Sequence, residues 1–327
     1  MTHALLPLSE PDSWRAALRG VPHAFAHTWG SCRAMSLTSG LETFLYVYDD
    51  GPHRVVCPLA VRSHAGYADV LTPYGFSGFV GTGPCPDFPA RWAAFARAQG
   101  FVCGYVGLNP ALDRGLYEAP GEAHAFNSAF LLDLAAGEAA LFARLSTNRR
   151  RQMREWERGG AAIVTDRPRL AAFFAEHLAA FLDERRAARI YYLVPETIEA
   201  LCALDDVLLL GAAVGGRIEA VSMFGHTPHV GDYLFNVSVP EGRRHSAPLI
   251  WHGALRLQAL GVPRMNLGGG IRPGDGVAAF KMRFGGEERP LRSLRQVYAP
   301  EVYEALCRRA GADPADRGGY FPPYHAR

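Results

Sequence analysis

The segment VLLLGAAVGGRIEAVSMF, residues 207–224, has the pattern of two strands joined by a glycine turn. An apolar run ends at Gly215-Gly216, and a second run follows in which apolar and polar residues loosely alternate. Two strand patterns separated by a two-residue glycine turn predict a β-hairpin. The first half of the chain has the same arrangement, with an apolar, aromatic segment at 43–48, the turn Asp49-Asp50-Gly51 and a second strand at 54–61.

Each hairpin is followed by the same series of elements. In the first half we expect a third strand at 69–72, a helix at 88–99 and a strand at 101–108. The corresponding segments of the second half are 232–239, 248–260 and 264–267. A glycine follows each predicted helix, as is typical of helix C-termini. The order β-β-β-α-β therefore occurs twice, which indicates two copies of one compact domain rather than a solenoid.

The length of 327 residues agrees with two domains of ordinary size. We expect an α/β (α+β) fold of two tandem domains, each with a mixed central sheet flanked by helices. The N-terminal domain is expected to span 1–137 and the C-terminal domain 138–295. The junction is placed near residue 137, where alanine-rich sequence passes into an arginine-rich helix.

Composition narrows the class of protein. With 49% hydrophobic and 20% charged residues, the chain has the composition of a soluble globular protein, and its net charge of +2 indicates no basic field over the whole molecule. No stretch approaches about 18 uninterrupted apolar residues, and the start has no secretion signal, so we expect a cytoplasmic protein without a membrane span. The six cysteines lie far apart, without a C-x-x-C pair, so we expect free thiols and no metal site.

An arginine-rich helix is predicted between the N-cap signal Ser146-Thr147 and the stop signal Gly159-Gly160. Arg150, Arg154 and Arg158 recur every four residues and therefore share one face. Such a face is most often simply solvated. It also suits the phosphates of an RNA acceptor stem or of a nucleotide, and both interpretations stay open.

A basic loop precedes the helix predicted at 248–260. The strand at 232–239 leads through Arg243 and Arg244 into that helix, which has Pro248 in its first turn. Loop amides and a helix N-terminus form a site that suits a pyrophosphate or a ribose phosphate. The arrangement resembles the acyl-CoA loop of the GNAT acyltransferases. Both spaced glycines of that family are missing here, which disfavours close approach of a pyrophosphate to the backbone.

Lysine occurs only once in the chain. Of the 34 Lys and Arg residues, 33 are arginine and one, Lys281, is lysine. It follows the segment NLGGG at 266–270, the pair Asp275-Gly276 and Phe280. A compact ammonium can enter a narrow pocket that a planar guanidinium cannot, which favours a functional lysine. The alternative is that arginine-rich coding left one lysine codon unchanged.

This C-terminal motif, together with TPYGFSG at 72–78, resembles the Fem family of peptidyltransferases and the related acyltransferases with a duplicated GNAT fold. The resemblance extends from about residue 27 to residue 306. It implies two tandem GNAT-like domains, with the tail at 296–327 packing back on the first. It also implies a cytoplasmic transferase that moves an aminoacyl or acyl group onto an amine, often from an aminoacyl-tRNA.

The resemblance implies that Phe280 and Lys281 lie where the carbonyl of the donor is attacked. Lys281 is then the catalytic residue, because a positive charge aimed at the tetrahedral oxyanion lowers the barrier. The substrate-binding candidates are Phe280, Tyr74, Asn236, Asp275, Gly269, Arg185 and Arg186, and the candidates for binding donor phosphates or RNA are Arg243, Arg244, Arg150, Arg154 and Arg158. Asn236 lies inside an apolar strand, where its amide could equally bond a neighbouring backbone.

The favoured function is aminoacyl transfer from an aminoacyl-tRNA to an amine of a small metabolite or cell-wall precursor, with no tightly bound cofactor. One rival is an acyl-CoA-dependent N-acyltransferase, and the other is a non-catalytic binding protein. The basic helix favours the tRNA donor over CoA, and the isolated Lys281 argues against a silent protein. No Ser-His-Asp or Cys-His nucleophile arrangement is visible in the sequence, so we expect direct attack by the amine. No oligomeric state is predicted.

Overall fold

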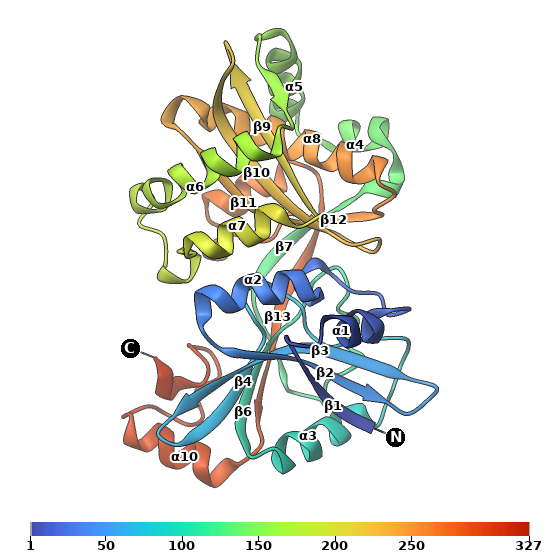
Figure 1. The fold of residues 1–327 in the computed structure, drawn as a ribbon, viewed down its shortest axis with the longest axis vertical. Helices are drawn as coiled ribbons and strands as arrows, with labels where there is room; N and C mark the ends of the chain where they lie inside the picture. Colours follow the sequence, from blue (N-terminus) through green and yellow to red (C-terminus); the bar gives the residue numbers. More distant parts are fainter. Residues whose placement is uncertain (1, 327) are drawn as a thin grey trace. The chain divides into compact units, whose positions relative to one another are not determined.

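The computed structural model describes residues 2–326, and its contacts divide the chain into two compact units (Figure 1). Unit 1 comprises Met1–Asn127 and Pro290–Arg327, and unit 2 comprises Ser128–Arg289. Two strands, β7 (Ala123–Asp133) and β13 (Glu287–Val297), begin in one unit and end in the other. The domain junction near residue 137 stays a prediction.

Unit 1 is built on a mixed sheet in which the strands follow the order β1-β2-β3-β4-β6-β13, with β5 paired to β3. Its strands besides β13 are β1 (Thr2–Pro7), β2 (Glu42–Asp49), β3 (Arg54–His64), β4 (Tyr67–Leu71), β5 (Val80–Gly81) and β6 (Phe101–Gly107). Its helices are α1 (Pro11–Leu18), η1 (Phe25–His27), α2 (Trp29–Ser39), α3 (Phe88–Ala98), α10 (Pro300–Arg309) and η5 (Pro323–His325).

In unit 2 the strands of the same sheet follow the order β7-β12-β11-β10-β9-β8, again with parallel and antiparallel pairs. Besides β7 these are β8 (Ala162–Val164), β9 (Val207–Val214), β10 (Arg217–His226), β11 (Gly231–Ser238) and β12 (Arg264–Asn266). The helices are η2 (Leu134–Ala136), α4 (Glu138–Arg144), α5 (Thr147–Arg158), α6 (Arg167–Glu184), η3 (Arg189–Tyr191), α7 (Pro195–Ala203), η4 (Pro240–His245), α8 (Ser246–Ala259) and α9 (Gly276–Met282).

The repeated order of elements is confirmed. It is β2-β3-β4-α3-β6 in unit 1 and β9-β10-β11-α8-β12 in unit 2. In both units the first three strands are antiparallel, and the helix then crosses to a parallel partner, β4 to β6 and β11 to β12. A parallel pair needs such a crossover, whereas an antiparallel pair needs only a turn. The predicted fold class, an α/β (α+β) chain of two units, each with a mixed sheet flanked by helices, is confirmed.

Alternation along β9 decides which helix covers which face of the unit 2 sheet. Leu210 and Ala212 belong to the same buried cluster as Leu257 of α8, whereas a side chain at Gly211 would meet Leu170 of α6. Because successive residues of a strand point to opposite faces, α6 and α8 cover opposite faces, as Figure 1 shows.

Unit 1 has its own core. Trp14 and Trp92 are fully buried, and Trp92 donates from Nε1 to Gln296 Oε1 at 2.9 Å. The end of the chain packs on β6, where Tyr303 and Leu306 of α10 join a buried cluster with Val102. All six cysteines are free and buried. Among residues 2–326, no helix combines the length and the apolar character needed to cross a membrane.

Candidate active site

The glycine loop after β12 is fixed at its start by one buried side chain. Asn266 accepts from the backbone N–H of Gly268 at 2.8 Å, and its Nδ2 donates to Asp232 Oδ1 at 3.0 Å. Asp232 lies on β11, directly beside Asn266 in the parallel register. The loop therefore leaves the sheet in a direction set by two neighbouring strands.

Asp275 closes the loop and begins α9. Its carboxylate accepts from the backbone N–H groups of Ala278, Ile271 and Arg272 at 2.7–2.9 Å. These hydrogen bonds, that of Ala278 first, hold the pKa of the carboxyl below its usual range. An ionised cap at a helix N-terminus is stabilising. Asp275 thus orients the helix that carries Lys281, and its predicted contact with a substrate stays a prediction.

Lys281 reaches back from α9 to the glycine loop. Its Nζ donates to the carbonyl oxygen of Gly269 at 2.8 Å, and a Cβ at Gly268 would lie only 3.2 Å from the same Nζ. The nitrogen also lies 5.8 Å from the centroid of the Tyr233 ring. Burial lowers the pKa of Lys281 to about 8, and the charge of Asp275 opposes this shift. At neutral pH the side chain is therefore mainly an ammonium beside a glycine backbone.

Two residues that the sequence did not single out extend this group. The Tyr233 hydroxyl lies beside Ser222, and Ser222 donates to Asn236 Oδ1 at 3.0 Å. Burial raises the pKa of Tyr233 far above its usual value, so the phenol is neutral. The predicted residues Asn236, Gly269 and Lys281 therefore lie in one neighbourhood of unit 2, linked through Tyr233. Alternation along β11 offered no signal that separated Tyr233 from an ordinary core residue.

Arg149 is a third residue that sequence analysis did not single out, because it lies within the arginine-rich stretch. It is buried, not on the solvated face. Its guanidinium lies 4.4 Å and 4.7 Å from the ring centroids of Phe280 and Phe284, and it donates to the Phe280 carbonyl at 3.2 Å. Burial, then the charge of Arg283, lowers its pKa to about 10, so it stays charged at neutral pH. Arg149 thus holds the last turn of α9, where a cation is favourable.

The basic loop at the start of α8 forms the 3-10 helix η4. Arg243 forms an ion pair with Glu184, and Arg244 lies 3.3 Å from the carboxylate of Glu219. Buried His245 lies 3.1 Å from Glu219 through Nε2 and accepts from Trp156 Nε1 at 2.7 Å. Both candidate arginines therefore have acidic partners within unit 2, and their contact with donor phosphates stays a prediction.

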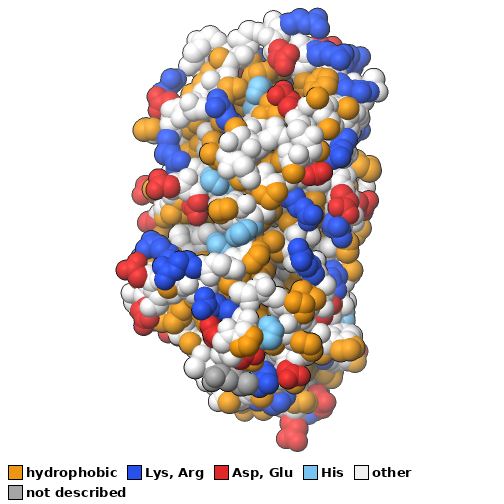
Figure 2. All heavy atoms as spheres, turned by 90° about the vertical axis from the view of Figure 1, so that its right-hand side faces the viewer, with side chains coloured by type: hydrophobic (Ala, Val, Ile, Leu, Met, Phe, Trp, Pro, Cys, Tyr) orange, Lys and Arg blue, Asp and Glu red, His pale blue; other side chains and the backbone are white. Residues whose placement is uncertain are grey.

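The predicted arginine-rich helix is α5, and Ser146 caps it by accepting from the Arg149 N–H at 3.3 Å. Arg154 lies over the ring of Phe142, with 5.5 Å to its centroid, and Arg158 is exposed in the last turn. Basic side chains gather at the end of unit 2 that carries α5 (Figure 2). The helix lies where the sequence predicts it, and RNA contact by its basic residues stays a prediction.

Three further candidates lie on other segments of the chain. Arg185 follows α6, with its guanidinium 3.6 Å from the centroid of the Phe181 ring, and the exposed Arg186 adopts a positive φ of 49°. Tyr74 is a residue of unit 1, in the bend after β4. Substrate binding by these three residues stays a prediction.

The sequence matches no family model and no curated protein. Solved structures do match. The structure of FemX is 11% identical with a TM-score of 0.68, over 93% of this chain and 99% of that one. The C-terminal domain of a putative lysylphosphatidylglycerol synthetase from Agrobacterium fabrum is 15% identical with a TM-score of 0.60, over 92% and 96%. L-PGS from Bacillus licheniformis is 14% identical with a TM-score of 0.57, over 88% and 92%. The predicted Fem-like fold is confirmed over nearly the whole chain.

Proposed function

We propose that the protein is a Fem-type acyltransferase that moves an aminoacyl group from an aminoacyl-tRNA to an amine of a small metabolite or cell-wall precursor. The observation that carries this proposal is the ammonium of Lys281, held 2.8 Å from the carbonyl oxygen of Gly269 in a fold shared with FemX. Six buried free thiols favour a reducing compartment, and we place the reaction in the cytoplasm.

In this reaction the acceptor amine attacks the ester carbonyl of the donor. A C–N bond forms, the carbonyl oxygen becomes an oxyanion, and the ester C–O bond then breaks with the ribose hydroxyl as leaving group. The proton released by the amine balances the proton gained by that hydroxyl. Lys281 is the group that stabilises the oxyanion, because its ammonium form predominates at neutral pH. In the reaction the ammonium donates to the oxygen of the reacting carbonyl in place of the Gly269 carbonyl oxygen.

The shape of η4 favours tRNA over CoA as the donor. A pyrophosphate needs free backbone N–H groups at the strand-to-helix turn. Here Gly242 donates to the Val239 carbonyl at 3.0 Å, Ser246 donates to the Arg243 carbonyl, and η4 continues directly into α8. A side chain at Gly242 would overlap the carbonyl of Glu219, so the turn is packed against β10. The N–H groups of Gly242 and Ser246 are therefore used internally.

The basic face of α5 supports the same choice of donor. Arg150, Arg154 and Arg158 supply three positive charges, and the nearest acidic residues of the helix are Glu155 and Glu157. Glu155 is engaged by Arg151 at 3.6 Å. Repeated cations along one helix face suit a backbone of phosphates more than a single pyrophosphate.

The acceptor is proposed to carry a phosphate that Arg185 and Arg186 recognise.

The test is donor consumption. The full chain is incubated with labelled aminoacyl-tRNAs or with acyl-CoAs in the presence of candidate amines, and Lys281→Met serves as the control for uncatalysed transfer. The proposal predicts that aminoacyl-tRNA is consumed, that an amide appears on the acceptor and that Lys281→Met is inactive. Saturable turnover of acetyl-CoA would establish the CoA-dependent rival. Acceptor binding without consumption of either donor would establish a binding protein.

A further inference from the structure

A cluster of metal-ligand side chains lies in unit 1, outside the group around Lys281. Asp50 and His53 belong to the turn between β2 and β3, and Cys85 belongs to the loop between β5 and α3. One potential ligand atom from each of the three residues lies within 4.8 Å of the other two. Sequence spacing did not indicate this cluster, because Cys85 is brought to the turn only by the pairing of β5 with β3.

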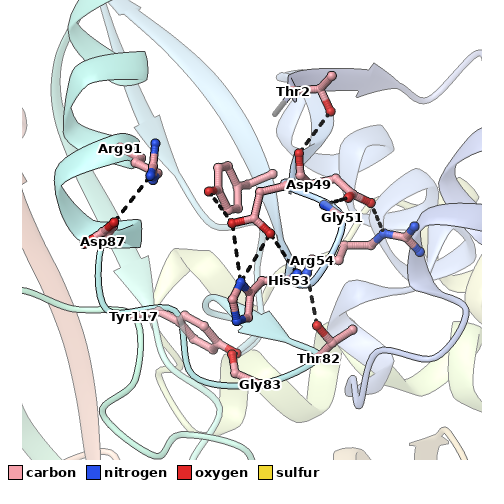
Figure 3. Close-up of polar contacts among 12 residues, drawn as sticks. Thr2, Asp49, Gly51, His53, Arg54, Thr82, Gly83, Asp87, Arg91 and Tyr117 are labelled. Carbon is pink, nitrogen blue, oxygen red and sulfur yellow. Dashed lines mark hydrogen bonds and ion pairs between the residues drawn. The ribbon is translucent and has the colours of Figure 1, made fainter.

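The carboxylate of the cluster is already oriented by the turn. Asp50 Oδ1 accepts from the backbone N–H of His53 at 2.8 Å and lies 3.2 Å from His53 Nδ1, and Oδ2 accepts from the Tyr48 hydroxyl at 2.9 Å. Figure 3 labels His53 among the polar contacts of this turn. Backbone hydrogen bonding to His53 is the main reason that the pKa of Asp50 lies below its usual range. Metal-ligating carboxylates are held by outer hydrogen bonds of this kind, and here Tyr48 supplies one.

Cys85 supplies a buried sulfur at the start of α3. The residue is 4% exposed, and the backbone N–H of Phe88 donates to its carbonyl oxygen at 3.0 Å. Burial, then the charge of Asp50, raises the pKa of the thiol, so the sulfur carries its proton until a cation displaces it. A thiolate and a carboxylate together carry two negative charges, which a divalent cation neutralises. Arg91, the cation nearby on α3, lies 3.3 Å from Asp87.

We propose that Asp50, His53 and Cys85 bind one Zn²⁺ ion, with water in the fourth position. Tetrahedral zinc with its usual bond lengths places neighbouring ligand atoms roughly 3.4–3.6 Å apart. The His53 and Asp50 atoms already lie 3.2 Å apart, so only the sulfur has to move closer. A thiolate and an imidazole select zinc over magnesium or calcium. On binding, Cys85 releases its proton to solvent and the ion links the β2–β3 turn to the start of α3.

The experiment is metal titration of the full chain after treatment with a chelator. Zn²⁺ is added during calorimetry, and Co²⁺ is added while the absorption spectrum is recorded. The proposal predicts one equivalent of zinc, a thiolate-to-cobalt charge-transfer band and a higher melting temperature with zinc. His53→Gln and Cys85→Ser should each weaken binding by about tenfold or more. Cys202→Ser is the matched control, since Cys202 is also 4% exposed and lies in unit 2.

Two outcomes would overturn the site. One is the absence of stoichiometric zinc binding, which would leave Asp50 and His53 as turn-stabilising residues only. The other is zinc binding by His53→Gln with the affinity of the parent protein. The His53 side chain is 37% exposed, so this variant is expected to fold even where Cys85→Ser disturbs the core.

Discussion

The Nζ of Lys281 lies 2.8 Å from the carbonyl oxygen of Gly269 and 3.2 Å from the position that a Cβ of Gly268 would occupy. The only ammonium side chain of the protein therefore points at a loop whose glycines leave the backbone open to it. We expect this space to accommodate a compact cation and to exclude a wider one, which leads to the first prediction.

Lys281→Arg should fold normally and lose most transfer activity, although the charge is kept. A guanidinium is wider than an ammonium and cannot place one donor at the oxyanion without displacing the glycine loop. Removal of one oxyanion donor typically lowers kcat by about 10² to 10³. Lys281→Met should have a similar effect, since it keeps the stem without the charge. Single-turnover transfer at saturating donor, measured beside a thermal melt, checks both, and near-parental turnover of the Arg variant would remove Lys281 from the site.

The second prediction concerns pH. Burial lowers the pKa of Lys281 to about 8, so the ammonium form is complete well below pH 8 and disappears as the pH rises through that value. An oxyanion-stabilising lysine therefore gives a transfer rate that falls above pH 8. A lysine acting as general base would give the opposite slope. Because the chain has one lysine, protein labelled with ¹³C-lysine gives a single side-chain signal, and its titration midpoint can be compared with the kinetic one.

The third prediction concerns Arg149 as a positioning residue. Arg149→Lys should lower the stability by about 1.5–3 kcal/mol, because a lysine cannot keep both the bonds to Gln152 and Phe280 and the stacking on two rings. The kcat should fall because α9, which carries Lys281, is displaced, whereas the KM for the donor should change little. Arg151→Lys, an exposed neighbour on the same helix that pairs with Glu155, is the control and should match the parent. The assignment would be contradicted if Arg149→Lys and the control variant changed KM and kcat to the same extent.

The order of elements was predictable because its signals are local. Glycine turns, alternating strands and a glycine after each helix all act within a few residues, and they marked the repeated β-β-β-α-β order in both units. The α5 boundaries belong to the same class of signal. Each depends on the backbone bonds of one turn, which the sequence encodes directly.

Residues that act across elements were not predictable in the same way. Arg149 has the same sequence context as its exposed neighbours, and only the packing of α5 against Phe280 and Phe284 buries it. Tyr233 became part of the candidate site because α9 brings Lys281 over its ring. The loop expected at Arg243 is instead a 3-10 turn, because Gly242 packs directly on the Glu219 backbone. These outcomes depend on packing between distant segments.

The last prediction tests the basic face of α5. If Arg150, Arg154 and Arg158 contact RNA phosphates, the logarithm of the tRNA binding constant should fall linearly with the logarithm of the salt concentration. Replacing all three with Gln should reduce that slope by about 0.7–0.9 for each phosphate that is no longer neutralised, and should weaken binding for every tRNA alike. The control triple variant replaces exposed Arg97, Arg308 and Arg309 of unit 1 with Gln, so that the net charge changes equally. Equal slopes for the two triple variants would show that α5 presents a merely solvated face, since a general change in charge would then account for the whole effect.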